Sequence, residues 1–494
     1  MSSPLYAVID LGSNSFHMLI TRQLADSVQI VDKVKRKVRL ASGLDKNNNL
    51  SAKSIARGLE CMRFFAERLQ DFPKQNIRIV ATATLRLANN RDTFLQQANQ
   101  ILGQNITLLS GEEEAKTIYK GVAYTSNILG NKLIFDIGGA STEIIIGENI
   151  DPIKAVSLDI GCVTFNQAFF ATGELTQAAF SQAIAHAKTQ ITPVVKDYQD
   201  IEHQVVLGGS GTMQALAEML MYAKQPTLID YDFLIQTKQQ LIDCKSFDNI
   251  ALDGLVGERI PVFASGLCIL IALFESFQVD RLHLSSGALR EGLLYDMLPT
   301  TKNVDIATLT INSMMSKYHV EQDHGARVLY LAKQLFDAYA PTNAQLGQQD
   351  AFILGAACQL HEIGLLIEYK QHQHHGAYII EHSQMPGFNQ SEKQTLAMLV
   401  QQQKDSIKKG VLDNQLLPKT RCLAMLMILR VAIILASRRQ QDQLPILKVS
   451  GENKMLVLMF DVDWLSAHPL IKDELSREIK ELAKFDLTLT IKLS

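Results

Sequence analysis

Two acidic residues, each followed by a run of small residues, are the part of this sequence best suited to chemistry. Asp10 ends one apolar stretch and Asp136 ends another, and the turns that follow supply the small residues Gly12, Ser13, Asn14 and Ser15 in the first case and Gly138, Gly139, Ser141 and Thr142 in the second. Backbone N–H groups of such turns can bind phosphate oxygens, and a carboxylate beside them can bind a divalent cation. A single acidic residue at a strand end is usually only a turn cap. The repetition favours a phosphate and metal site.

A hydrolase that acts on phosphoanhydrides also needs a group that orients or deprotonates water. The best candidate lies in residues 110–116, Ser-Gly-Glu-Glu-Glu-Ala-Lys. Successive helical residues point about 100° apart, so the three glutamates cannot share one direction. Glu114 flanks the apolar stripe one turn before Ile118, whereas Glu113 faces the more polar side. Glu114 is therefore the candidate base. The alternative is that these glutamates only complement the helix macrodipole.

Further phosphate contacts are available, each with a simpler explanation. The basic run at 33–39, which includes Lys35, Arg36 and Arg39, is equally well explained as a solvated edge strand. Arg86 follows an expected strand and can clamp a phosphate, although a lone arginine there is more often a surface ion-pair partner. A glycine-rich loop enters a helix and can also approach a phosphate through Gly209, Ser210 and Gly211. Asp10, Asp136 and Glu143 are hard oxygen ligands suited to Mg²⁺.

The order of the expected elements indicates how these residues meet. Residues 1–124 predict three strands followed by alternating helices and strands, and from residue 132 the same three-strand opening returns at 132–137, 143–147 and 153–159. Two copies of one plan predict two similar α/β domains, 1–124 and 125–300, that face each other across a cleft with the ligand where the two turns meet. Strand signals then vanish, which predicts a helical domain at 301–439 and a small α/β domain at 440–494.

Bulk properties set the broad class of the protein. The 494 residues exceed what one core accommodates. A net charge of −3 and 47% hydrophobic residues give no general reason to expect nucleic acid as a partner. The six cysteines form no CxxC pair, so we expect a reducing, cytoplasmic location and no disulfide framework. Apolar windows such as 260–277 contain Pro, Gly or Ser and are typical of core helices, so no membrane association is expected.

In these motifs the chain resembles the exopolyphosphatase/guanosine pentaphosphatase (Ppx/GppA) family, part of the actin-like (ribonuclease H-like, ASKHA) superfamily that also contains chaperone ATPases and sugar kinases. The resemblance extends over essentially the whole chain and rests on residues 7–17, 35–40, 83–86, 110–115, 136–143, 161–164, 211–212 and 287–292. The sequences Lys-Arg-Lys-Val-Arg-Leu at 35–40, Ala-Thr-Ala-Thr-Leu-Arg at 81–86 and Gly-Gly-Ala-Ser at 138–141 are more similar to the guanosine pentaphosphatase branch.

The resemblance implies removal of a terminal phosphate from pppGpp, giving ppGpp and phosphate, with Mg²⁺ and in a homodimer. It implies that Glu114 is the base, that Asp10, Asp136 and Glu143 lie near the metal, and that the two turns, the basic run and Arg86 contact a long polyanion. A substrate with five phosphates needs several cations, because each exposed pair contributes little. The alternatives are a processive exopolyphosphatase acting on polyphosphate and, in another class, an ATP-dependent kinase.

The expected helical domain carries Leu-His-Glu-Ile-Gly at 360–364, which resembles the HD-type metal phosphohydrolase signature with Glu362 in place of aspartate. His361, His374 and His375 can still bind a metal, and His324 stands near the position of the upstream histidine of that signature. Loss of the aspartate removes a bridging ligand, so we expect a degenerate domain with a structural role.

Overall fold

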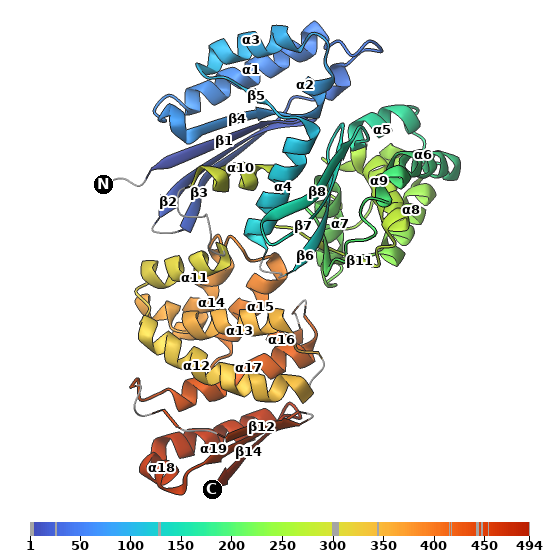
Figure 1. Ribbon diagram of the computed structural model, residues 1–494. Helices are drawn as coiled ribbons and strands as arrows, with labels where there is room; N and C mark the ends of the chain where they lie inside the picture. Colours follow the sequence, from blue (N-terminus) through green and yellow to red (C-terminus); the bar gives the residue numbers. More distant parts are fainter. Residues whose placement is uncertain are drawn as a thin grey trace. The chain divides into compact units, whose positions relative to one another are not determined.

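The computed structural model describes residues 4–24, 27–126, 130–298, 306–342, 345–413, 415, 417–440, 444, 445, 448–452 and 454–493. The chain divides into two compact units, Met1–Ile306 and Ala307–Ser494 (Figure 1). The domain boundary predicted between residues 300 and 301 lies outside the described residues.

The first half of the first unit is built on a mixed five-stranded sheet in the order β3-β2-β1-β4-β5. The first three strands are antiparallel neighbours, while β4 and β5 run parallel to β1. Ser51 begins the first helix by accepting the backbone N–H of Ser54, as the sequence predicts. The elements are β1 (Leu5–Leu11), β2 (Ser15–Leu24), β3 (Ser27–Lys37), α1 (Ala52–Arg68), β4 (Ile77–Ala81), α2 (Ala83–Leu87), α3 (Arg91–Leu102), β5 (Thr107–Leu108) and α4 (Gly111–Thr125).

The second half repeats this plan in a six-stranded sheet of order β10-β11-β9-β6-β7-β8. Its antiparallel trio β6, β7 and β8 corresponds to β1, β2 and β3, and its parallel strands β9 and β11 correspond to β4 and β5. The predicted internal repeat is therefore present in the topology. The elements are β6 (Asn131–Ile137), β7 (Thr142–Glu148), β8 (Asp151–Leu158), α5 (Cys162–Phe169), α6 (Gln177–Val195), β9 (Val205–Gly208), α7 (Gly211–Tyr222), β10 (Leu228–Asp230), α8 (Tyr231–Cys244), α9 (Ile260–Phe277), β11 (Arg281–Leu284) and α10 (Leu289–Met297).

The last helix of each half packs against the sheet of the other half. Helix α4 contacts β7 and β8, whereas α10 contacts β1, and the two helices cross each other (Figure 1). Their backbones approach closely at glycines: a Cβ on Gly121 would overlap the carbonyl oxygen of Ala288, and a Cβ on Gly292 would overlap that of Thr117. This exchange places the N-terminal turns of both helices beside the β1–β2 and β6–β7 turns.

Helix α9 forms the centre of the second half. It is the one helix among the described residues that is long and apolar enough to cross a membrane, and 67% of its window is buried inside the protein. It contacts α5, α6, α7, α8 and β6. The interpretation of residues 260–277 as a core helix is confirmed by this packing.

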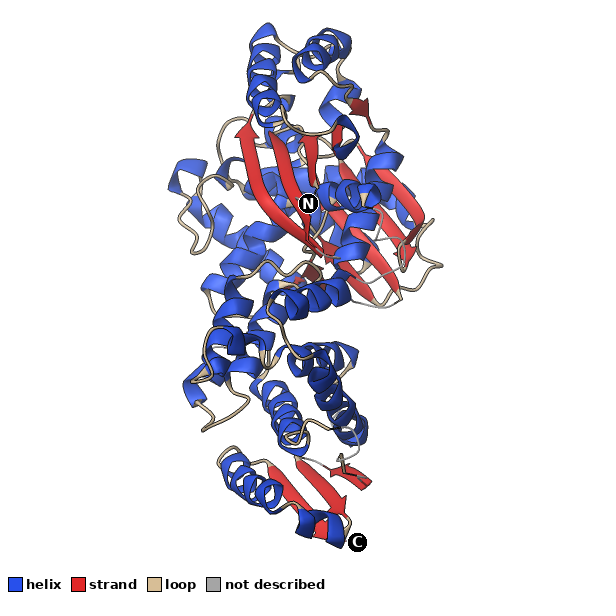
Figure 2. Ribbon diagram, turned by 90° about the vertical axis from the view of Figure 1, so that its left-hand side faces the viewer, coloured by secondary structure: helices blue, strands red, loops and turns tan. Residues whose placement is uncertain are grey.

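The second unit joins a group of helices to a three-stranded sheet of order β12-β13-β14. Buried residues of the helices and of the sheet form one continuous hydrophobic cluster. Figure 2 shows the helices blue and the strands red, with the small sheet near the C-terminus. The elements are α11 (Ile306–Lys317), α12 (Gln322–Tyr339), α13 (Gln348–Leu360), α14 (His372–His382), α15 (Gln390–Gln401), α16 (Lys409–Asp413), α17 (Lys419–Leu435), β12 (Lys448–Glu452), β13 (Met455–Phe460), α18 (Val462–Ala467), α19 (Pro469–Ala483) and β14 (Thr488–Leu493).

Candidate active site

A polar cleft of about 410 Å³ lies between the two halves of the first unit. Equivalent places in the two halves supply part of its lining: the β1–β2 and β6–β7 turns and the first turns of α4 and α10. The loops that follow β9 and β11, both in the second half, and Thr82 after β4 also contribute. The turns lie directly opposite each other, because a Cβ added to Gly139 would be 2.8 Å from the Cβ of Ser13 and 3.6 Å from the backbone nitrogen of Asn14.

Five carboxylates line this cleft. Asp10 and Asp136 lie one residue before the ends of β1 and β6, Glu143 lies on β7 opposite Asp136, and Glu114 and Glu291 lie in the first turns of α4 and α10. Burial raises the pKa of Asp10 to about 7, with Arg290 acting in the opposite direction. Burial, then the neighbouring charges of Glu114 and Asp10, raise the pKa of Asp136 to about 7. Without a bound cation, burial and mutual repulsion of these carboxylates favour protonation of Asp10 and Asp136 near neutral pH.

Glu114 is oriented as the helical phase predicts. Glu114 is buried, with 7% of its surface exposed, whereas Glu113 is exposed and closes a capping box with Ser110. The Arg86 guanidinium donates to Oε2 of Glu114 and to the carbonyl oxygen of Leu109. Burial raises the pKa of Glu114, while the charge of Arg86 lowers it. Arg86 therefore keeps a buried carboxylate closer to its ionised form.

The donor set of the cleft fits a hard divalent cation. One carboxylate oxygen of Asp10, Oδ1, is buried without a hydrogen-bond partner among the described residues. Glu143 accepts from the Ser157 hydroxyl at 2.7 Å, which fixes one of its oxygens. Burial raises the pKa of Glu143 well above its ordinary range. A cation bound by oxygens from several of these groups would remove their repulsion, and Mg²⁺ prefers such ligands.

Strand β3 presents its basic residues to two different environments. Side chains alternate along a strand, so Lys33, Lys35 and Lys37 share one face, and Lys33 and Lys35 line the cleft. Lys37 forms an ion pair with Glu258 at 3.3 Å. Arg36 points the other way and lies over the ring of Phe64, 5.0 Å from its centroid.

Most residues predicted to bind phosphate or metal line the cleft, and four do not. The residues outside the lining are Arg36, Arg39, Arg86 and Thr142. Arg36 is on the far face of β3. Arg86 is paired with Glu114, and the Thr142 hydroxyl donates to the carbonyl oxygen of Ile160 at 2.6 Å. These four are therefore not among the residues that line the cleft, and their phosphate contacts stay predictions.

Comparison with known proteins agrees with this architecture. A sequence model of the Ppx/GppA phosphatase family matches residues 19–301, and a second, for domain III of the Ppx/GppA phosphatases, matches residues 306–479. The chain belongs to the Ppx/GppA phosphatase family. It is 46% identical to the guanosine-5'-triphosphate,3'-diphosphate pyrophosphatase of Pseudoalteromonas translucida over 99% of this chain and 98% of that one. The protein of the same name from Aeromonas hydrophila is 43% identical over 98% of both chains.

Solved Ppx/GppA structures share the fold of about 60% of the chain. An exopolyphosphatase from Cytophaga hutchinsonii superimposes with a TM-score of 0.54 at 22% identity, covering 60% of this chain and 99% of that one. The Ppx/GppA enzyme of Aquifex aeolicus gives a TM-score of 0.50 at 21% identity over 59% of this chain and 98% of that one. The α/β architecture with mixed sheets is thus that of the family.

Several cleft residues of this Ppx/GppA chain were not predicted from the sequence, among them His17, Arg259, Arg290 and Glu291. Arg290 Nη1 lies 3.2 Å from His17 Nδ1. A guanidinium can only donate, so His17 Nδ1 accepts, and burial followed by the charge of Arg290 lowers the pKa of His17 to about 3. Arg290 belongs to the 287–292 motif, but only the packing of α10 against β1 brings it to Asp10.

Proposed function

We propose that this protein hydrolyses the terminal 5'-phosphoanhydride of guanosine pentaphosphate, pppGpp, giving ppGpp and phosphate. The observation that carries the proposal is the buried Glu114 carboxylate, held by Arg86 within a cleft that also contains Asp10, Asp136 and Glu143. Near full-length similarity to two proteins named guanosine-5'-triphosphate,3'-diphosphate pyrophosphatase supports the choice of substrate.

In the proposed reaction Glu114 takes a proton from the attacking water, and the leaving group is ppGpp. Mg²⁺ would be held by Asp10, Asp136 and Glu143, and when bound it supplies positive charge to the phosphate oxygens. Backbone N–H groups of the two facing turns hold the terminal phosphate. Arg290, fixed by neutral His17, adds a guanidinium on the same side as Asp10. Arg86 keeps Glu114 oriented and ionised.

Exopolyphosphatase activity is the second candidate, and the lysine face of β3 favours it. Lys33 and Lys35 line the cleft, and Lys37 continues the row. Lysines at every second position of a strand can bind successive phosphates of a linear polyanion, and they need no contact with a nucleobase. The terminal phosphoanhydrides of polyphosphate and of pppGpp are chemically alike, so one site can serve both.

The test is phosphate release by the purified full chain with pppGpp, long-chain polyphosphate and ATP in parallel. We expect pppGpp to be the best substrate and Glu114→Gln to lose at least about 100-fold in kcat. Glu113→Gln is the matched control, because Glu113 is the exposed capping neighbour, and we expect it to retain turnover. Near-normal turnover by Glu114→Gln on every substrate would refute the mechanism. Phosphate transfer from ATP to an acceptor would favour a kinase.

We also infer that the helices of the second unit form an HD-like domain, that the protein is a homodimer and that it is cytoplasmic. The HD-like assignment is supported by His361 and Glu362 directly after α13 and by His324 in α12. The cytoplasmic location is supported by six cysteines that are all free. Sedimentation of the full chain tests the dimer, and fractionation of cells tests the location.

A further inference from the structure

A second cluster of metal-binding side chains lies in the second unit, separate from the proposed active site. His324, His361 and Glu362 are buried, with 3%, 2% and 9% of their surfaces exposed. Each offers one ligand atom, and these atoms all lie within 4.8 Å of one another. His374 and His375, which the sequence suggested as ligands, are not part of this cluster.

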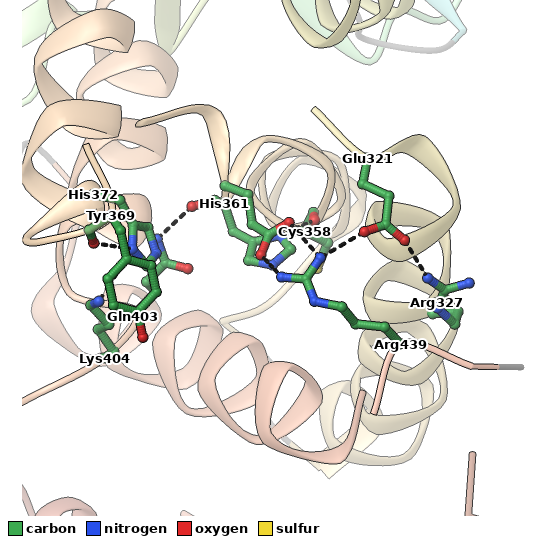
Figure 3. Close-up of polar contacts among 10 residues, drawn as sticks. Glu321, Arg327, Cys358, His361, Tyr369, His372, Gln403, Lys404 and Arg439 are labelled. Atoms are coloured by element: carbon green, nitrogen blue, oxygen red, sulfur yellow. Dashed lines mark hydrogen bonds and ion pairs between the residues drawn. The ribbon is translucent and has the colours of Figure 1, made fainter. Parts of the chain in front are cut away.

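The two histidines are prepared to act as ligands. The Nδ1 atom of His361 is 2.7 Å from the carbonyl oxygen of Cys358. A carbonyl can only accept, so Nδ1 carries the proton and Nε2 presents its lone pair, the second-shell arrangement usual for a metal-bound histidine. Gln403 donates to the His361 carbonyl at 2.6 Å and holds the backbone (Figure 3).

His324 has an unsatisfied polar atom at the same place. Its Nδ1 is buried without a hydrogen-bond partner among the described residues, and its ring centroid is 5.2 Å from that of His361. A buried polar group without a partner is costly. Burial is the main cause that lowers the pKa of both histidines, to about 4 for His361.

We propose that His324, His361 and Glu362 bind one divalent transition-metal ion, with water in the remaining positions. Two imidazoles and a carboxylate suit Zn²⁺, Co²⁺ or Fe²⁺ and are poor ligands for Mg²⁺. Metal–ligand bonds of about 2.1 Å place tetrahedral ligands about 3.4 Å apart, so small rotations of the three side chains close the site. The cleft, with its oxygen ligands, selects Mg²⁺, so the two sites take different ions.

Arg439 competes with the metal for Glu362. Its guanidinium forms ion pairs with both Glu362 and Glu321, the latter at 2.7 Å, as Figure 3 shows for Arg439 and Glu321. The Arg439 side chain is 43% exposed, so it can turn towards solvent and keep Glu321 as its partner. A bound metal then supplies the positive charge that the buried Glu362 requires. Removal of the competing guanidinium should therefore tighten metal binding.

The probe is Co²⁺, whose visible absorption reports its ligands. The full chain is stripped with a chelator, dialysed and titrated with Co²⁺, with Mg²⁺ in excess to fill the cleft. We expect one saturating band and one bound ion by elemental analysis, loss of the band in His361→Gln and His324→Asn, and at least tenfold tighter binding in Arg439→Gln.

Two controls separate this site from others. His375→Ala removes a histidine that pairs with Glu368 outside the cluster, and Asp136→Asn alters only the cleft, so both should keep the band. Emission of Trp464, the single tryptophan, checks that the second unit of each variant is folded. If the histidine variants do not fold, the test rests on the other two variants: Glu362→Gln should lose the band, and Arg439→Gln should bind Co²⁺ more tightly. The proposal is overturned if the wild type shows no absorption band at millimolar Co²⁺, whatever the result for Arg439→Gln. It is also overturned if the band remains when His324, His361 or Glu362 is replaced.

Discussion

Replacing Asp136 with asparagine tests whether the cleft stores electrostatic repulsion that a cation relieves. Asparagine keeps the shape of the side chain and removes one negative charge. The pKa of Asp136 is raised from 3.8 to about 7, first by burial and then by the charges of Glu114 and Asp10. A rise of this size corresponds to about 4 kcal/mol, and this is an upper value because the neighbouring carboxylates share the cost.

The direction in which the free energy of unfolding changes with pH follows from the linkage between protonation and folding. A carboxyl whose pKa is higher in the folded state than in the unfolded state binds protons preferentially when folded. The free energy of unfolding of the metal-free wild type should therefore fall as the pH rises from about 4 to about 7, and then level off. Asp136→Asn should lack part of this decline and be more stable than the wild type by up to about 4 kcal/mol above pH 7. The two proteins should be equally stable near pH 4.

The assay is denaturant unfolding in a chelator at several pH values, followed by far-UV circular dichroism. Trp464 is the single tryptophan and lies in the second unit, so its emission follows that unit and should not respond to the substitution. Added Mg²⁺ should raise the stability of the wild type above pH 7 and have little effect on Asp136→Asn. Identical pH profiles of the two proteins without metal would refute the electrostatic account of the cleft.

Three other predictions follow from individual contacts. Arg86→Gln should shift the acidic limb of the pH–rate profile to higher pH, because Arg86 lowers the pKa of Glu114; an unmoved limb would show that Arg86 does not tune the base. Gly121→Ala should cost about 1–3 kcal/mol of stability through overlap with the Ala288 carbonyl, whereas Gly257→Ala, which meets nothing within 4 Å, should not; melting curves distinguish them. Lys35→Ala should raise KM for long polyphosphate several-fold, whereas Arg36→Ala should leave KM unchanged, since only Lys35 lines the cleft; equal effects would contradict the two-faced strand.

Much of the local structure follows from neighbouring residues. The three-strand openings, the Ser51 cap, the core helix at 260–277 and the burial of Glu114 all depend on alternation, helical phase or capping, which act over a few residues. The repeated topology also follows, because two similar patterns in one chain fold in similar ways. These features were predicted from the sequence and are present in the structure.

Contacts between segments far apart in the sequence could not be predicted from patterns of neighbouring residues. No local pattern states that the chain exchanges α4 and α10 between the sheets, and this exchange brings Arg290 to His17 and Asp10. Alternation separates Lys35 from Arg36, but only packing decides that Lys35 faces the cleft and Arg36 faces Phe64. Similarly, His324 rather than His374 joins His361, because the packing of α12 against α13 sets which side chains meet.

The sequence by itself determined that Asp10 and Asp136 end matching strands beside small-residue turns, since strand and turn formation depend on adjacent residues. The sequence also predicted that the two turns face each other, but the tertiary structure alone decided that α4 and α10 exchange sheets and bring Arg290 to His17 and Asp10. The physical reason is the close crossing of α4 and α10 at Gly121 and Gly292, which fixes the distance between the two halves across the cleft.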